Sequence, residues 1–512
     1  MPKIVIIGNG VAGTNAARHI RKLSDNQIVM ISEETLKPFS RTALMYVFMG
    51  HVKQESTELY EDWFWEKNRI ERVQTRVESI DAENKILQLS HGQSMTYDKL
   101  IIAVGSKSNK FGWRGQDLKG VHGLYHLQDM EAMERYSKGL KRAVVVGGGL
   151  IGIEMAEMFA SRGIAVTFLV REKSFWDLIL PAEESAMINR HILEHHIDLR
   201  LGTELDEIIG DENGVVKAIT TKSGERIECG FVGLTVGVSP NVVPTPALPK
   251  GEGAFDLPFG EGRSGAISLP FGEAGNSLPK GEGRSGAISL PFGEGRGGDY
   301  IEVGRGYLVD EYLTTSNPDV YAIGDCAELR RPQQGRRAIE AVWYTGRMMG
   351  QTVARTVCGQ PTKYEPRLWF NSAKFFDIEY QVYGDVLAKN PEGVTSLYWE
   401  HQSGKKAIRV NFSSLNPSKG GTFSPPFGGT YVTGFNLMGI RYRHEVCEKW
   451  ILERTPIETV LEHLSLANFD PEFFDEYEKE FVHQYNQLTG SDLRLKAKRR
   501  LSFVGRFLAR LG

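Results

Sequence analysis

A short apolar segment followed at once by closely spaced glycines constrains the fold of this chain most. Lys3–Ile7 is an apolar run that is typical of a buried parallel strand, and Gly8, Gly10 and Gly13 follow it in the spacing G-x-G-x-x-G. Residues 14–23 then show a helical pattern. Glycines at these places permit a tight turn and let the pyrophosphate of a dinucleotide reach the helix N-terminus.

The next strand strengthens this prediction. Ile28–Ser32 is a second apolar run, and it ends in Glu33 and Glu34, acids that can accept hydrogen bonds from ribose hydroxyls. The alternative is a tight strand–helix turn without a ligand, but strand, helix, second strand and acid in register favour dinucleotide binding. We call this strand, glycine turn and helix N-terminus, together with the acid after the second strand, the first cradle. Its candidate residues are Gly8, Gly10, Val11, Ala12, Gly13, Glu33 and Glu34.

The same pattern recurs further along the chain. The strand Ala143–Val146 is followed by a glycine run, a helix to about Arg162 and the strand Ala165–Val170. Two such runs, each in a complete βαβ context, argue against a turn without a ligand. Here the expected acid is missing, because Val170 takes its place. The candidate residues of this second cradle are Gly147, Gly149, Leu150, Ile151 and Gly152.

Three further segments stand in a characteristic order. Tyr97–Gly105 (YDKLIIAVG, with Ala103) is an apolar strand, Gly237 opens the segment GVSPN, and Val320–Ile323 is a strand that stops at Gly324 and Asp325. An Asp at a strand end beside a helix N-terminus suits a polyhydroxyl chain such as ribityl. The alternative for Asp325 alone is a helix cap.

This order of motifs resembles the pyridine nucleotide–disulfide oxidoreductase superfamily, over residues 1 to about 385. The resemblance implies an α/β fold with two Rossmann-like domains, the NAD(P) domain inserted in the FAD domain, and a C-terminal α+β interface domain that often dimerises. The expected boundaries are 1–117 and 305–364 for FAD, 118–304 for NAD(P)H, and 365–512 for the interface domain. FAD and NAD(P)H are the implied cofactors.

Within the superfamily, the sequence is most similar to the group without a redox disulfide: rubredoxin and ferredoxin reductases, the nitrite reductase flavoprotein and apoptosis-inducing factor. The segment from Pro38 to Leu44 resembles their P-Y-x-R-x-x-L, which implies that Arg41 contacts the FAD phosphates. The further residues that the resemblance assigns to cofactor binding are Val77, Lys107, Glu154, Gly237, Val342 and Trp343. The family's lysine near the flavin falls at Tyr46, so an ion pair with Glu154 is in doubt. The alternative for Glu154 is an acid favoured by the helix dipole.

The nicotinamide cofactor is weakly specified. Arg171 could pair the 2′-phosphate of NADPH, whereas Glu172 opposes it. Taken together, these two residues slightly favour NADPH over NADH as the cofactor. No acid–base catalytic residue is assigned, because the flavin carries the chemistry.

The cysteines exclude one class of chemistry. Residues 1–228 contain none, so a thiolate relay on the helix after the first βαβ turn cannot operate. The four cysteines, Cys229, Cys326, Cys358 and Cys447, form no C-x-x-C pair and no His/Cys cluster. A disulfide framework and a metal site are therefore not expected, and Cys326 is interpreted as a packing residue.

Two glycine-rich segments interrupt the pattern. The stretch at about 245–299 contains GRSGAISLPFGE twice, at 262–273 and 283–294, and a shorter one lies at about 414–430. A solenoid is the alternative, but two copies are too few for a stacked core. Inserted surface loops are the favoured interpretation.

Charge and hydropathy restrict the classes of partner and the cellular location to be expected. The net charge is −3, which argues against a general nucleic-acid binder, and no apolar stretch reaches about 18 residues. A cytoplasmic location is expected, because the first strand leaves no room for a signal peptide. Residues 491–512 carry a basic, amphipathic pattern. Three interpretations of this tail stay open: it contacts an anionic membrane surface, it binds an acidic partner protein, or it is a fraying terminal helix without a partner.

These observations predict an FAD-dependent NAD(P)H oxidoreductase that passes hydride to FAD and electrons to an acceptor. The expected acceptor is an iron–sulfur protein of the ferredoxin or rubredoxin kind, or else a quinone. The alternative is a flavin-bound redox sensor or scaffold with slow turnover. A monooxygenase is a third interpretation that no second-substrate motif supports.

Overall fold

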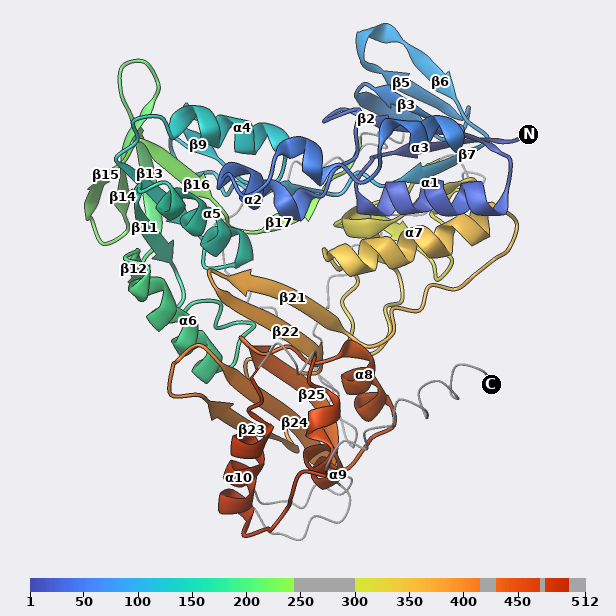
Figure 1. Ribbon diagram of the computed structural model, residues 1–512. Coiled ribbons are helices and arrows are strands. Elements are labelled where there is room, and N and C mark those ends of the chain that lie inside the picture. Colours follow the sequence, from blue (N-terminus) through green and yellow to red (C-terminus); the bar gives the residue numbers. More distant parts are fainter. Residues whose placement is uncertain (244–299, 415–429, 470–474, 497–512) are drawn as a thin grey trace, which may run out of the picture. The chain divides into compact units, whose positions relative to one another are not determined.

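A computed structural model describes residues 1–243, 300–414, 430–469 and 475–496 (Figure 1). The chain divides into two units. Unit 1 comprises Met1–Asn109, Tyr125–Glu131 and Val238–Glu365, and unit 2 comprises Lys110–Leu124, Ala132–Gly237 and Pro366–Gly512. Each unit contains one of the two glycine-rich cradles.

Unit 1 is built on a five-stranded parallel sheet. Its order is β19-β7-β1-β2-β3, with β1 (Lys3–Ile7) at the centre. The other strands are β2 (Gln27–Ser32), β3 (Ile70–Gln74), β7 (Lys99–Ile102) and β19 (Val320–Ala322). Apart from their first residues, the central strands β1, β2 and β7 are almost entirely apolar and buried, as a sheet covered on both sides requires. This is the strand order of a dinucleotide-binding fold.

Two helices of unit 1 pack unusually close together. Helix α1 (Val11–Leu23) follows β1, and α7 (Trp343–Val357) runs beside it (Figure 1). A side chain at Gly350 would place its Cβ 2.5 Å from the carbonyl oxygen of Ala12. Only glycine at this position permits the approach, which brings the N-terminus of α7 to the first cradle.

The remaining described elements of unit 1 are short. They are α2 (Leu44–Phe48), α3 (Asp62–Lys67), β4 (Val77–Asp81), β5 (Ile86–Leu89), β6 (Ser94–Thr96), β8 (Ser106–Ser108), β17 (Val238–Pro240), β18 (Tyr307–Val309) and β20 (Ala327–Leu329). Strands β4, β5 and β6 form an antiparallel sheet, β8 pairs with β17, and β18 pairs with β20.

Unit 2 has a parallel sheet like that of unit 1, except that its edge strand β9 precedes the central strand β10 in the chain. Its parallel sheet has the order β12-β11-β10-β16-β9. Its elements are β9 (Val121–His122), β10 (Arg142–Val146), α5 (Leu150–Ser161), β11 (Ala165–Val170), α6 (Ala182–Glu194), β12 (Asp198–Leu201), β13 (Leu205–Gly210), β14 (Val216–Thr221), β15 (Arg226–Glu228) and β16 (Phe231–Leu234). Helix α4 (Leu127–Tyr136) begins in unit 1 and ends in unit 2. The predicted pair of Rossmann-like folds is confirmed.

The C-terminal part of unit 2 is an antiparallel sheet with three helices. The strand order is β21-β22-β25-β24-β23. These strands are β21 (Phe370–Phe375), β22 (Ile378–Gly384), β23 (Val394–Glu400), β24 (Ala407–Ser414) and β25 (Thr430–Met438), and the helices are α8 (His444–Leu452), α9 (Ile457–Glu462) and α10 (Glu478–Thr489). Alternating apolar and polar residues predict strands at 368–376, 394–400, 407–412 and 431–435, which match β21, β23, β24 and β25, whereas β22 is additional. This part clusters with the second cradle rather than by itself, so the boundary at residue 365 stays a prediction as a domain limit.

The repeat insert and the basic tail lie largely outside the described residues, at 244–299 and 497–512. The residues that flank the insert belong to the core of unit 1. Val243 and Ile301 are both buried in the core of unit 1, and the Val243 N–H donates to the Tyr307 hydroxyl at 2.8 Å. At the start of the tail, Leu493 and Leu495 pack against the core of the C-terminal sheet.

We expect that deleting residues 250–297 leaves FAD binding intact, because both flanks of the insert are buried in the same core. Shortening a loop of this length changes its closure entropy by only about 2 kcal/mol. Flavin absorbance per chain and the melting temperature of the purified variant check this. Loss of folding on deletion would show that the insert is structural.

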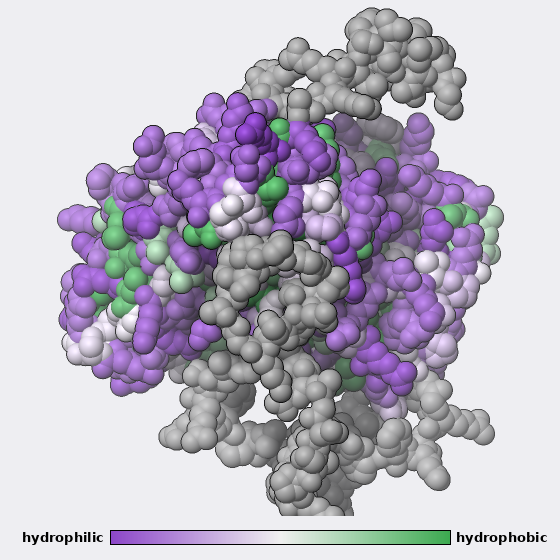
Figure 2. All heavy atoms as spheres, turned by 90° about the horizontal axis from the view of Figure 1, so that it is seen from below, coloured by the Kyte–Doolittle hydropathy of each residue, from purple (hydrophilic) through white to green (hydrophobic). Residues whose placement is uncertain are grey.

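The surface and the helices bear on the expected contact with a membrane. On the face drawn in Figure 2, the described residues are mostly hydrophilic, with apolar residues in small scattered groups. Within the described ranges, no helix combines the length and apolar character needed to cross a membrane.

Candidate dinucleotide-binding sites

The first cradle combines two crowded glycines with one open one. At Gly8 (φ 108°) an added Cβ would lie 2.1 Å from the carbonyl oxygen of Ala103, and at Gly13 it would lie 2.0 Å from that of Gly8. At Gly10, the N-cap of α1, a Cβ would meet nothing within 4 Å. The crowded pair holds the turn together, and the open position leaves room for a ligand at the helix N-terminus. No acid lies in the first turn of α1, which suits an anion there.

The two predicted acids after β2 differ in their environment. The side chain of Glu33 is about half exposed (52%), with its Oε2 3.7 Å from the Nε of Arg76. The side chain of Glu34 is only 8% exposed and is fully engaged within the protein. Glu33 is therefore the acid with a surface available to a ribose.

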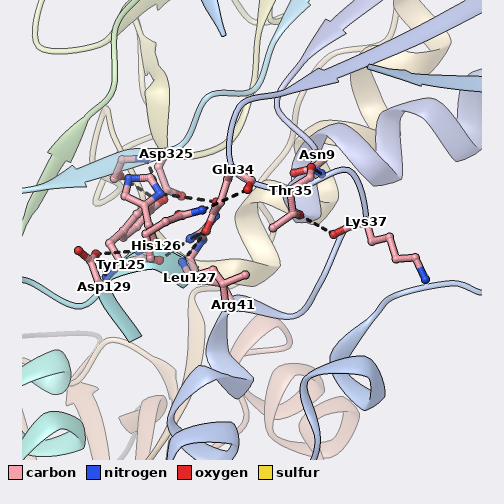
Figure 3. A network of polar contacts seen from close by, with 12 residues as sticks. Asn9, Glu34, Thr35, Lys37, Arg41, Tyr125, His126, Leu127, Asp129 and Asp325 are labelled. Atoms are coloured by element: carbon pink, nitrogen blue, oxygen red, sulfur yellow. Dashed lines mark hydrogen bonds and ion pairs between the residues drawn. The ribbon is translucent and has the colours of Figure 1, made fainter. Parts of the chain in front are cut away.

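Glu34 organises a polar network in unit 1 (Figure 3). Its two oxygens accept from Arg41, Nη1 at 3.0 Å and Nη2 at 2.6 Å, and Oε1 also accepts from the Leu127 N–H at 2.7 Å. Burial alone would raise the pKa of Glu34, but hydrogen bonds from His126, Arg41 and Leu127 outweigh it and lower the pKa to about 2.

The lowered pKa makes a testable contribution to stability. The ionised Glu34 stabilises the fold fully above its unfolded-state pKa near 4.5, and this contribution is lost as the pH falls toward 2. We expect Glu34→Gln to lower the free energy of unfolding by about 3 kcal/mol at pH 7. Denaturant unfolding of apo-protein from pH 7 to 3 checks this: the difference from wild type should shrink with acid. A difference independent of pH would contradict it.

Arg41 contacts the protein on several sides. Besides Glu34, it donates to the Tyr125 carbonyl oxygen, and its guanidinium lies 4.6 Å from the centre of the Tyr125 ring. Burial alone would lower the pKa of Arg41, but Glu34 outweighs this and raises it. Arg41 is therefore a fixed cation beside Asp325, and its predicted contact with FAD phosphates stays a prediction.

Asp325 lies in a short 3-10 turn, Gly324–Cys326, directly after β19. Its Oδ2 accepts from the Ser106 hydroxyl at 3.0 Å and from the Tyr125 hydroxyl at 3.4 Å. Burial raises the pKa of Asp325 above its ordinary value, against these two hydrogen bonds. A buried carboxylate of this kind gains from further donors such as the hydroxyls of a ribityl chain.

Ser106 and Tyr125 are site residues that the sequence analysis missed. The Tyr125 hydroxyl accepts from the Ser106 N–H at 2.8 Å, and burial together with the Asp325 charge raises the pKa of Tyr125 to about 12. Tyr125 is 200 positions from Asp325 in the chain, so no local pattern could connect them.

The second cradle in unit 2 has the same division of roles. A Cβ at Gly147 (φ 119°) would lie 2.5 Å from the Thr235 carbonyl oxygen, and one at Gly152 would lie 2.1 Å from that of Gly147. At Gly149, the N-cap of α5, a Cβ would meet nothing within 4 Å. Again the open glycine faces a helix N-terminus without an acid in its first turn.

The strand that ends beside this cradle carries no acid of its own. Val170 is fully buried, and a Cβ on Gly148 would lie 2.6 Å from its side chain. The next two residues form an ion pair: Arg171 Nη2 lies 2.8 Å from Glu172 Oε1. The Arg171 charge is therefore already compensated by its neighbour.

Glu154 lies one turn into α5. Burial and the charge of Glu157 raise its pKa to about 7. A carboxyl group that titrates near neutrality is a common feature of functional sites, although ion-pair networks also produce it.

The other predicted site residues occupy varied positions. Val77 and Ala103 are buried, Lys107 is exposed and pairs in register with Ser239, and Gly237 is exposed with φ 92°. Val342 caps the N-terminus of α7, and Trp343, its first residue, is 38% exposed. Leu150 and Ile151 open α5, as Val11 and Ala12 open α1. Their roles toward cofactors stay predictions.

The four cysteines are free thiols in the structure. Cys326 follows Asp325 but is fully buried, and burial raises its pKa to about 12. Burial also raises the pKa of Cys229 to about 12 and that of Cys447 well above its ordinary value. The three buried thiols are poor nucleophiles.

Comparisons with known proteins agree with this geometry. Residues 2–248 match the family model described as "Pyridine nucleotide-disulphide oxidoreductase". Rubredoxin-NAD(+) reductase of Ectopseudomonas oleovorans is 26% identical over 371 residues, 72% of this chain and 83% of that protein. The ferredoxin–NAD(+) reductase component of the biphenyl dioxygenase system of Paraburkholderia xenovorans is 24% identical, over 79% of this chain and 86% of its own.

A solved structure supports the fold. The crystal structure of NADH:rubredoxin oxidoreductase from Clostridium acetobutylicum superimposes with a TM-score of 0.60 at 20% identity, covering 90% of this chain and 99% of that chain. At this identity the likeness concerns the fold alone.

Proposed function

Because the chain belongs to the pyridine nucleotide-disulphide oxidoreductase family and is an FAD-dependent NAD(P)H oxidoreductase, we propose that it passes electrons to a separate iron–sulfur protein without a redox disulfide. The observation that carries this proposal is the presence of two cradles with open helix N-termini together with three buried thiols, those of Cys229, Cys326 and Cys447, whose pKa values burial raises. The names of the relatives, which act with rubredoxin or ferredoxin, support the acceptor class.

Each part of the two cradles has its own role in binding the cofactors. The open N-terminus of α1 at Gly10 binds the FAD pyrophosphate, and Glu33 accepts from the adenosine ribose. Asp325, held by Ser106 and Tyr125, orients the ribityl chain. The N-terminus of α5 at Gly149 binds the pyrophosphate of the nicotinamide cofactor. FAD, when bound, supplies the ring that accepts the hydride.

A reductive titration tests the absence of a redox disulfide. The flavin alone takes up two electrons per chain, whereas a flavin with a redox-active disulfide takes up four. We expect dithionite to reduce the anaerobic protein fully with about two electrons per FAD. Uptake of about four would contradict the proposal and implicate two of the four cysteines.

Stopped-flow reoxidation tests the acceptor. The NAD(P)H-reduced protein is mixed with a ferredoxin, a rubredoxin or a soluble quinone, and flavin absorbance is followed. Reoxidation by an iron–sulfur protein, slowed by added salt, is expected if charged surfaces guide the encounter. Reoxidation by the quinone alone would favour the quinone, and flavin reduction by NAD(P)H over seconds to minutes would favour the redox sensor.

The ion pair after β11 favours NADH, which departs from the slight preference for NADPH predicted from sequence. A 2′-phosphate would have to compete with Glu172 for Arg171, whereas the Glu172 carboxylate can accept from a 2′-hydroxyl. We expect Glu172→Gln to raise the NADPH to NADH ratio of kcat/KM by about tenfold, which is about 1.4 kcal/mol. Arg171→Ala is the control and should not raise it. An unchanged ratio in Glu172→Gln would place cofactor selection elsewhere.

A further inference from the structure

Two histidines and an aspartate lie close together in unit 2. None of them belongs to the residues of the second cradle. His191 lies in the last turn of α6, His195 caps that helix, and Asp377 lies in the turn between β21 and β22. One ligand atom from each of the three lies within 4.8 Å of the others. We propose that these three side chains form a binding site for a divalent transition-metal ion of the zinc class.

The separations fit an ion between the three groups. Nε2 of His191 is 2.5 Å from Oδ1 of Asp377, and Nε2 of His195 is 3.6 Å from the same oxygen. An ion bound tetrahedrally at about 2.1 Å holds its ligand atoms about 3.4 Å apart. The observed separations lie on both sides of this value, so small side-chain shifts admit the ion.

Without a metal ion, His191 is the residue of the three that keeps a buried ring nitrogen without a hydrogen bond. Its side chain is 1% exposed, and although Nε2 is near Asp377 it makes no hydrogen bond of acceptable geometry. A short contact without a directed N–H leaves a buried nitrogen uncompensated, which costs free energy. A metal ion at this place would use the Nε2 lone pair.

The surrounding groups match those that support metal ligands in proteins. Nδ1 of His191 faces Oε2 of Glu194 at 3.2 Å, and Oδ2 of Asp377 faces the Lys405 ammonium at 3.0 Å. A carboxylate on the second ring nitrogen fixes a histidine's tautomer and orientation, and a donor on the second carboxylate oxygen favours binding through one oxygen. The Lys405 charge opposes a cation, and the two carboxylates of Asp377 and Glu194 offset it.

The remaining contacts hold the cluster in place. Phe376 adopts φ 54° at the turn, a conformation that bulky residues rarely adopt, and its ring stacks on His195 with centroids 4.1 Å apart.

The donor set indicates the ion. Two imidazole nitrogens and one carboxylate oxygen suit Zn²⁺ and its first-row neighbours better than Mg²⁺ or Ca²⁺, which prefer oxygen. Three protein ligands leave one position for water on the exposed side of His195. The ion would tie α6 to the β21–β22 turn. This proposal departs from the prediction of no metal site, which rested on the cysteines.

The test compares two adjacent histidines in the tag-free, FAD-loaded full chain after removal of bound metal. His195→Asn removes a ligand, and His196→Asn is the matched control, because His196 is exposed, lies outside the cluster and has φ 57°, which asparagine tolerates. Zn²⁺ is titrated by calorimetry, and melting temperatures are measured with and without Zn²⁺.

Wild type and His196→Asn are expected to bind one Zn²⁺ per chain with a dissociation constant on the order of micromolar and to melt higher with Zn²⁺. His195→Asn should bind at least about 100-fold more weakly, and Glu194→Gln about tenfold more weakly. Wild type that takes up no Zn²⁺, or equal binding by His195→Asn and His196→Asn, would overturn the proposal. Equal melting of both variants without metal shows that neither change disrupts the fold.

Discussion

Replacing Gly10 with valine is expected to give a folded protein that binds FAD at least about 100-fold more weakly, a loss of about 2.8 kcal/mol or more. The backbone of Gly10 (φ −66°, ψ −173°) is one that valine adopts, and an added Cβ meets nothing within 4 Å. The new side chain therefore occupies only the space through which the pyrophosphate approaches the N-terminus of α1.

The measurement is flavin absorbance after reconstitution with excess FAD, with the melting curve of apo-protein as the check on folding. Gly13→Val is the contrasting variant, because its Cβ would lie 2.0 Å from the Gly8 carbonyl oxygen. It should destabilise the apo-protein by at least about 1–3 kcal/mol. A yellow Gly10→Val variant with one FAD per chain would show that the pyrophosphate binds elsewhere.

Replacing Gly149 with valine is expected to separate the two cofactors. The second cradle lies in the other unit, so FAD binding should be unchanged. Gly149 (φ −113°, ψ −174°) also tolerates a side chain, and its Cβ would point into open space. We expect reduction of the flavin at subsaturating NADH to slow by at least about 100-fold, since the pyrophosphate no longer reaches α5.

Dithionite serves as the control for this variant. It reduces flavin without the second cradle and should act on Gly149→Val as on wild type. Gly152→Val, with its Cβ 2.1 Å from the Gly147 carbonyl oxygen, should instead destabilise unit 2. NADH reduction at the wild-type rate in Gly149→Val would remove the second cradle from the mechanism.

The C-terminal sheet shows where sequence patterns stop being informative. Four of its strands were predicted from alternation, but β22 was not. Only Phe376 and Asp377 separate β21 from β22, and Asp377 is the one residue of this two-residue turn that favours a turn. An aspartate without a following glycine is a weak hairpin signal, and the stacking of Phe376 on His195 exists only in the folded chain.

The sequence by itself determined the two cradles, because each is local: a buried strand, three glycines at fixed spacing and a helix N-terminus fall within about 20 residues. Only the tertiary structure decided which of the two acids after β2 keeps an exposed side chain that can reach a ribose. Glu33 and Glu34 are neighbours, yet Glu34 is engaged by Arg41, seven positions further along, and by Leu127, 93 positions away. Likewise, only folding brings Tyr125 to Asp325, and Asp377 to His191. The physical reason is that spacing along the chain fixes backbone geometry over a few residues, whereas hydrogen bonds and burial depend on which distant segments the sheets bring together.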